Sequence, residues 1–154
     1  DIDNLMLDNG IVRNRRKIIS TIKGAQIWQD IESSIGFNNY IWNFVDGAPI
    51  QNDFISMSEV PKFTDLSTKI SKDLKSHGFN FCGPTIVYAW MEACGIVNNH
   101  LVSCPCHEKI KYYRKIYPSK KILLQRTHLS QLRLNGPYYL FQYPLFFLNT
   151  LLTQ

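Results

Sequence analysis

Acidic residues are missing from the end of the chain. Residues 110–154 contain seven Lys and Arg and no Asp or Glu, whereas residues 1–109 contain ten Lys and Arg against twelve Asp and Glu. The net charge of +5 therefore comes from the end of the chain, and it is poor evidence for a nucleic-acid partner. This change in composition predicts a folded domain over residues 1–109 and a basic, apolar tail over residues 110–154.

A long uninterrupted hydrophobic run is also missing. The most apolar stretch, residues 138–152, is broken by Pro144 and is shorter than the roughly 20 residues that a membrane-spanning helix needs. We therefore predict no membrane partner. Two explanations of the tail stay open: it lies on a membrane surface, or it is sequence that selection never shaped, such as read-through past a disrupted gene end.

Cysteine is scarce, and no signal peptide precedes it. The chain has four cysteines, which excludes a dense disulfide framework and predicts a reducing, cytoplasmic compartment. Cys104 and Cys106 lie close in sequence to His100 and His107. A His and a Cys four positions apart have a common metal-ligand spacing.

Strand-like alternation of apolar and polar residues is absent from the first 109 residues, so we predict an all-α fold. Gly83-Pro84 predicts the start of a central helix and Gly95 its end. Its residues 85–94 are almost all apolar, which predicts a nearly fully buried helix. Further helices are predicted over residues 2–8, 13–33, 38–45 and 67–76, and residues 50–64 are predicted to form an irregular loop.

Four segments occur in a specific order and spacing: DNGIVRNRRKI at 8–18, YIWNFVDGAPI at 40–50, SEVP at 58–61, and the long segment 70–104. Together they resemble the DNA-3-methyladenine glycosylase I family of bacterial base-excision enzymes. The resemblance implies a helix-hairpin-helix-type glycosylase bundle that acts as a monomer on double-stranded DNA with alkylated bases. It also implies flipping of an alkylated adenine out of the duplex and hydrolysis of its N-glycosidic bond.

The resemblance covers about residues 1–107 and begins partway through the family pattern, so we expect an N-terminally truncated domain. The family's recognition carboxylate and main stacking aromatics lie in the missing segment, so no catalytic residue is assigned here and the chain alone is expected to be inactive. Thr85 and Ala89 are expected to form one wall of the base pocket. Two alternatives stay open: a non-catalytic DNA-binding fragment, or a non-functional truncated gene product.

The turn between the first two predicted helices is a candidate DNA contact. Free backbone N–H groups at Gly10 and at the next helix start can hold a phosphate, and Arg13, Arg15 and Lys17 add positive charge. Val12 stands where a second hairpin glycine is usual. The alternative is a solvated basic helix end.

The resemblance implies a structural zinc site in which His100 and Cys104 join a Cys and a His near the family's N-terminus. That second pair is missing here, so only half of the ligand set is present. One alternative is that Cys106 and His107 supply the other two ligands, in a cramped local geometry. The remaining alternative is a ligand pair that holds no metal.

Overall fold

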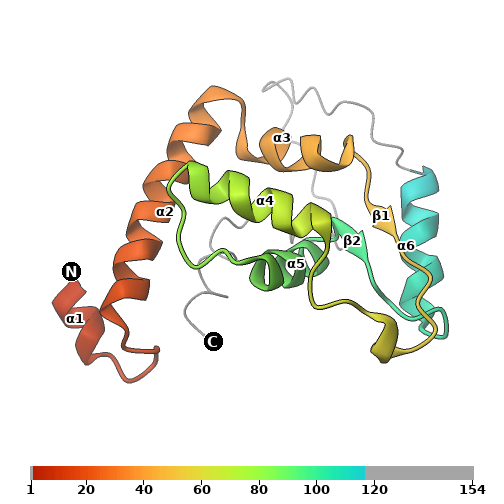
Figure 1. Cartoon of the computed structure of the whole chain (residues 1–154), viewed down its shortest axis with the longest axis horizontal. Coiled ribbons are helices and arrows are strands. Elements are labelled where there is room, and N and C mark those ends of the chain that lie inside the picture. The colour runs from red at the N-terminus through yellow and green to blue at the C-terminus, as the bar shows by residue number, and fades with distance from the viewer. Residues whose placement is uncertain (1, 117–154) are drawn as a thin grey trace, which may run out of the picture.

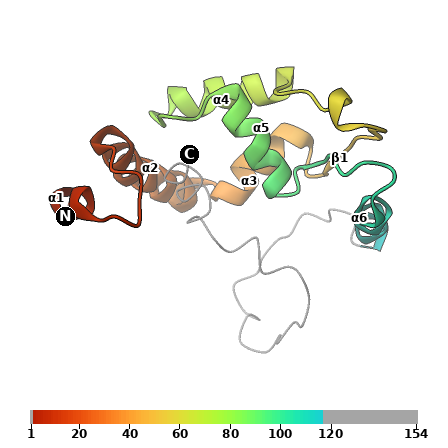
Figure 2. The ribbon, with the colours of Figure 1, turned by 90° about the horizontal axis from the view of Figure 1, so that it is seen from below.

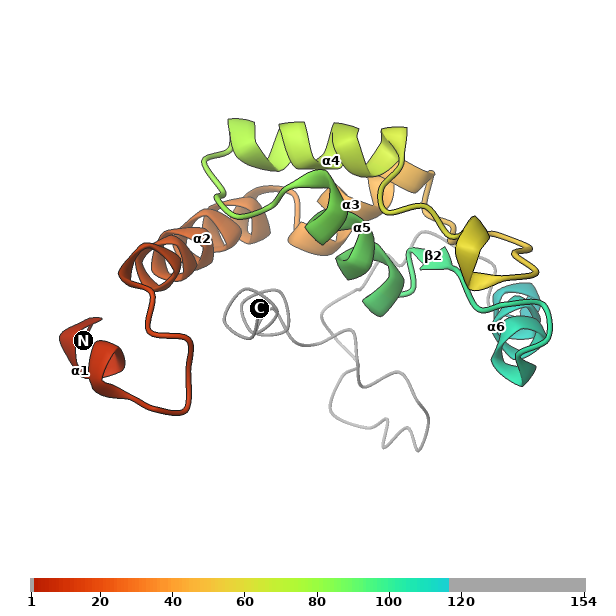
Figure 3. The same cartoon turned by 60° about the horizontal axis from the view of Figure 1, so that its bottom comes forward.

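The computed structural model describes residues 2–116, and the side chains of residues 2–111. The elements in chain order are α1 Ile2–Leu7, α2 Arg15–Ser34, α3 Phe37–Trp42, η1 Asn43–Val45, β1 Ile50–Gln51, η2 Met57–Glu59, α4 Asp65–Ser76, α5 Pro84–Ala93, β2 Val97–Asn98 and α6 Pro105–Ile116. Helices α2 to α5 form a central cluster, with α1 at one end and α6 at the opposite end (Figures 1, 2 and 3).

Local signals set the ends of these helices. The Asn14 side chain accepts hydrogen bonds from the first-turn amides of α2, so this helix begins at Arg15 and not at the predicted residue 13. Thr64 and Ser67 form a reciprocal capping box, which starts α4 two residues before the predicted position. Pro84 begins α5 as predicted, because its fixed φ suits the first helical turn.

The core lies mainly between α4 and α5. Ile70 and Leu74 of α4 and Val87 and Met91 of α5 have no exposed surface. Burying a side chain of this size contributes roughly 1.5–3 kcal/mol. Aromatic side chains of the next segment also belong to the core: Tyr40 of α3 is buried and packs edge-on against Phe44.

The prediction of a nearly fully buried α5 is wrong. Thr85, Ala89 and Ala93, each four positions from the next, are exposed, as is Glu92. These residues share one face of the helix because 3.6 residues make a turn. Counting alanine as apolar overstated the burial, since a small apolar side chain gains little from leaving water.

The all-α prediction also needs correction, because the described residues are mostly helical but include a small parallel sheet. Ile50 pairs with Val97 and Gln51 with Asn98. Each strand has two residues, too short for any alternation to be detected in the sequence. The pair joins the predicted irregular loop to the segment after α5, between the central cluster and α6 (Figures 1 and 3).

Within residues 2–116, no helix combines the length and the apolar character needed to cross a membrane. The predicted boundary after residue 109 falls inside α6, and the division into two regions stays a prediction. Of the predicted tail, residues 117–154 lie outside the described residues.

Candidate functional site

The His100–Cys104 pair occupies the loop between β2 and α6. The His100 Nδ1 atom lies 3.6 Å from the Cys104 Sγ atom, with His100 exposed and Cys104 half-buried. Zinc bonds of about 2.0–2.1 Å to nitrogen and about 2.3 Å to sulfur, at a tetrahedral angle, place the two donors about 3.6 Å apart. The pair therefore fits two corners of a tetrahedral zinc site.

A local completion of that site is not formed. His107 is fully buried, and its Nε2 atom lies 3.0 Å from the Asn52 carbonyl oxygen and 3.1 Å from Asp53 Oδ1. Its Nδ1 atom faces Glu108 Oε1 at 3.2 Å. Both ring nitrogens of His107 are thus occupied. Across residues 2–111, no three His, Cys, Asp or Glu side chains gather closely enough to hold a metal ion.

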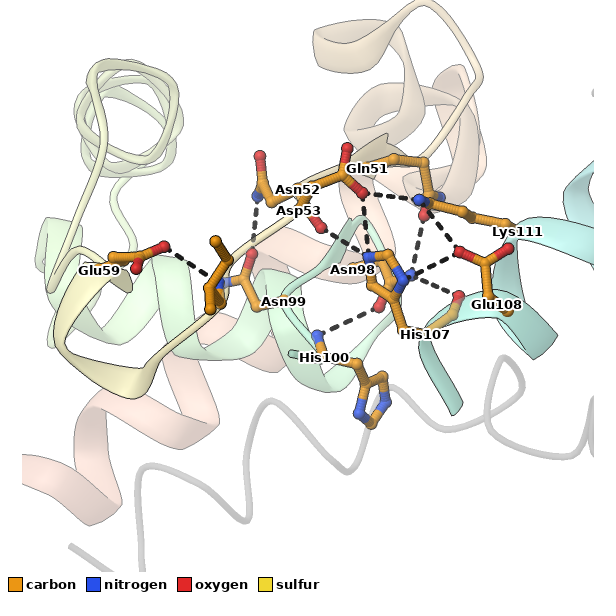
Figure 4. A network of polar contacts seen from close by, with 11 residues as sticks. Gln51, Asn52, Asp53, Glu59, Asn98, Asn99, His100, His107, Glu108 and Lys111 are labelled. Carbon is orange, nitrogen blue, oxygen red and sulfur yellow. Dashed lines mark hydrogen bonds and ion pairs between the residues drawn. The ribbon is translucent and has the colours of Figure 1, made fainter. Parts of the chain in front are cut away.

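A network of polar side chains surrounds the loop that carries the pair (Figure 4). Asn98 is buried, and its Oδ1 atom accepts from the His100 backbone N–H at 3.2 Å. Its Nδ2 atom donates to Gln51 Oε1 at 2.8 Å and to the His107 carbonyl at 3.3 Å. Sequence reasoning did not single out Asn98, because nothing local distinguishes a buried asparagine from the many exposed ones.

Charged groups at the outer edge of this network join α6 to the segment after β1. Lys111 Nζ lies 2.6 Å from Asp53 Oδ1 and 3.4 Å from Glu108 Oε1. The hydrogen bond from Lys111 lowers the pKa of Asp53, and the same bond raises the pKa of Lys111. The Asp53 side chain is exposed and that of Lys111 partly so, and the ion pair therefore contributes little to stability.

In the predicted DNA-contacting turn before α2, several polar groups already have partners within the protein. The Gly10 amide donates to Asp8 Oδ1 at 2.7 Å, and its φ is not in the positive range. Arg15 pairs with Asp3. Asn14 Oδ1 accepts from the amides of Arg16 and Lys17, at 3.1 and 3.2 Å. The amides expected to hold a phosphate therefore already have protein acceptors. The predicted DNA contacts of Gly10, Arg13, Arg15 and Lys17 stay predictions.

The turn between α4 and α5 differs from this turn, because no side chain accepts from the amides at the start of the helix that follows it. Gly78 (φ 98°) and Phe81 (φ 56°) adopt left-handed conformations that reverse the chain within a few residues. No side chain caps the N-terminus of α5, and a Cβ atom at Gly83 would meet nothing within 4 Å. Ser71, buried in α4, donates to the Cys82 carbonyl at 2.6 Å and holds the turn in place. This turn presents an uncapped helix start to an open surface.

A shallow hollow of about 370 Å³ lies between α2 and this turn. It is lined by Arg16, Ile19, Ser20, Lys23, Asn80 and Phe81. The two cations, Arg16 and Lys23, give the hollow a positive charge beside the turn that precedes α5. Ser20 is buried and its hydroxyl has no hydrogen-bond partner. The predicted pocket-wall residues Thr85 and Ala89 lie on the exposed face of α5.

Comparison with known proteins defines the class. A sequence profile for methyladenine glycosylase matches residues 1–107, so the chain belongs to the methyladenine glycosylase family. It is 40% identical over 108 residues to DNA-3-methyladenine glycosylase 1 of Escherichia coli (strain K12), and 40% identical over 107 residues to DNA-3-methyladenine glycosylase of Haemophilus influenzae. The matches cover 70% and 69% of this chain.

The fold agrees with this assignment. A crystal structure of 3-methyladenine DNA glycosylase I is 39% identical, with a TM-score of 0.67, over 69% of this chain and 59% of that one. A variant of such an enzyme in complex with 3-methyladenine is 36% identical, with a TM-score of 0.66, over 69% of this chain and 57% of that one. The chain spans 58% of the length of the two curated relatives.

Proposed function

We propose that this chain forms the C-terminal part of a DNA-3-methyladenine glycosylase, which removes the alkylated base from duplex DNA. The observation that carries the proposal is the family match over residues 1–107, at 40% identity to two glycosylases. Because the glycosidic bond lies inside the base stack, the base must be flipped out before it can be hydrolysed. Thr85 and Ala89, small and exposed, are proposed to line the pocket that receives it.

The activity test compares the chain alone with a mixture of the chain and a second polypeptide. The second polypeptide has the sequence of that part of the Escherichia coli relative which this chain does not span. Release of 3-methyladenine from alkylated duplex DNA is measured. We expect background release from the chain alone, since it spans 58% of that relative, and release above background from the mixture. A mixture that binds duplex DNA but never releases the base favours a non-catalytic DNA-binding module.

We infer that the DNA-holding helix-hairpin-helix is α4, its following turn and α5, and not the predicted turn at residues 8–18. Three features support this assignment: the uncapped N-terminus of α5, the open backbone at Gly83, and the cations Arg16 and Lys23, which share a hollow with Asn80 and Phe81 of the turn. Backbone amides at a helix start bind phosphate oxygens, and nearby cations strengthen that contact.

A glycine substitution tests the hairpin. Gly83→Ala adds a methyl group that meets no protein atom, so the fold should tolerate it, but the methyl group would stand in the way of a phosphate. We expect duplex affinity, measured by fluorescence anisotropy, to fall about tenfold, roughly the cost of one charge-assisted hydrogen bond. Gly10→Ala is the control at the N-terminal turn, where the added Cβ would lie 3.1 Å from the exposed Asp8 carboxylate, and it should leave affinity unchanged. The reverse ranking of the two variants would restore the N-terminal turn as the contact.

We also propose that His100 and Cys104 supply two of the four ligands of a structural zinc ion. Their 3.6 Å separation supports the proposal, and the other two ligands would come from outside residues 2–111. When bound, the zinc would supply a cross-link and no catalytic chemistry. Two ligands bind zinc weakly, so the purified chain should contain well under one zinc per molecule by elemental analysis.

A further inference from the structure

We propose that Asn98 is the positioning residue that closes the loop carrying His100 and Cys104 and holds their donor atoms at metal-binding distance. The inference rests on the proposed zinc pair. Asn98 belongs to β2 and is 3% exposed, so its amide group has to find its partners within the protein.

The Asn98 side chain bonds to both ends of the loop. At the start, its Oδ1 atom accepts from the His100 N–H, which fixes the backbone of the first metal donor. At the end, its Nδ2 atom donates to the carbonyl of His107, nine residues along the chain. A second Nδ2 bond, to Gln51 Oε1, ties the closed loop to β1.

His107 completes the closure from the α6 side. Its backbone N–H donates to the Cys104 carbonyl at 2.9 Å, so the second metal donor is held by the residue that Asn98 also holds. The His107 Nε2 atom carries the proton toward Asn52, because a carbonyl oxygen can only accept. The loop is therefore fixed at both ends and against the segment after β1, while the His100 ring points away from the network (Figure 4).

Such an arrangement lowers the cost of binding a metal ion. A free loop would have to be ordered at the moment of binding, whereas this loop is ordered by hydrogen bonds that exist before the metal arrives. Groups that orient metal ligands without touching the metal are commonly worth about 10–100-fold in metal affinity. Asn98 meets this description through backbone bonds to the ligand-bearing segment.

The experiment compares the wild-type chain with Asn98→Ala and with Asn99→Ala as the matched control. Asn99 is the adjacent asparagine, but its side chain bonds to Asn52, Tyr88 and Glu92 and not to the loop. The first measurement is metal-free: hydrogen exchange of the His100 amide, which should become about tenfold faster in Asn98→Ala alone. The second is cadmium affinity from the thiolate-to-cadmium charge-transfer band, which should weaken about tenfold in Asn98→Ala alone.

The outcomes separate the two proposals. If the wild type shows no charge-transfer band, the proposed zinc pair fails, and the exchange measurement still decides the role of Asn98. If Asn98→Ala does not fold, Asn98→Ser replaces it. A serine hydroxyl can still reach the His100 amide but not the His107 carbonyl, so cadmium affinity should fall while His100 stays protected. A folded Asn98 variant with wild-type exchange and wild-type affinity overturns the inference.

Discussion

The buried His107 makes a strong prediction about stability. Replacing it with alanine removes a ring with no exposed surface and its hydrogen bond to the Asn52 carbonyl, 3.0 Å away. The lost hydrogen bond costs about 1 kcal/mol, and the lost ring burial costs roughly another 1–2 kcal/mol. Asp53 and Glu108 remain exposed to water and add no further loss. We therefore expect His107→Ala to lower the free energy of unfolding by about 2–3 kcal/mol.

The assay is urea unfolding followed by far-ultraviolet circular dichroism, with the slope compared between variants to confirm that the same transition is measured. His77→Ala is the control, because the His77 side chain is exposed, and its contacts with the Asp73 carbonyl at 3.0 Å and with the edge of the Tyr40 ring leave it in water. That variant should lose less than about 1 kcal/mol. If His107→Ala and His77→Ala were equally stable, the reasoning from burial would be refuted.

Two further predictions concern helix capping and thiol reactivity. Thr64→Ala should lower stability by about 1 kcal/mol in the same urea assay, because it removes the acceptor for the Ser67 amide, whereas Thr68→Ala, in the next turn, should cost less. Burial raises the pKa of Cys94 to about 11, so at pH 8 its thiolate population, and hence its alkylation rate, should be about a hundredfold below that of an ordinary thiol. When alkylation is followed by mass spectrometry, Cys104 and Cys106 should be modified first. Equal alkylation rates at all four cysteines would contradict the burial of Cys94.

The sequence was sufficient for features that depend on neighbours in the chain. Gly83-Pro84 was predicted to begin a helix and Gly95 to end it, and the structure confirms both. The spacing of His100 and Cys104 predicted a pair of donors, and the two side chains lie 3.6 Å apart. These signals are local, because a glycine or proline constrains its own backbone whatever lies elsewhere.

Features that join distant segments could not be predicted in this way. Asn52 and His107 are 55 residues apart, and Gln51 and Asn98 are 47 residues apart. No periodicity links them, so the polar network was missed. The exposure of Thr85 and Ala89 was missed for a related reason: burial depends on which partner covers each face of a helix, and composition does not reveal the partner.

The same difference in sequence separation bears on the order of folding. The α4–α5 core joins residues 13 to 21 positions apart, such as Ile70 with Val87 and Met91, and closing a short loop carries a small entropy cost. The two hydrogen bonds that dock this loop onto the β1 region, from Asn98 to Gln51 and from His107 to the Asn52 carbonyl, must close loops of 47 to 55 residues, which is slower. The helical hairpin is therefore expected to form early, and the docking of the His100–Cys104 loop onto β1 later. By the same reasoning this docking is expected to open first in the native state, so capture and release of the proposed metal ion would follow a step that forms late and is readily reversed.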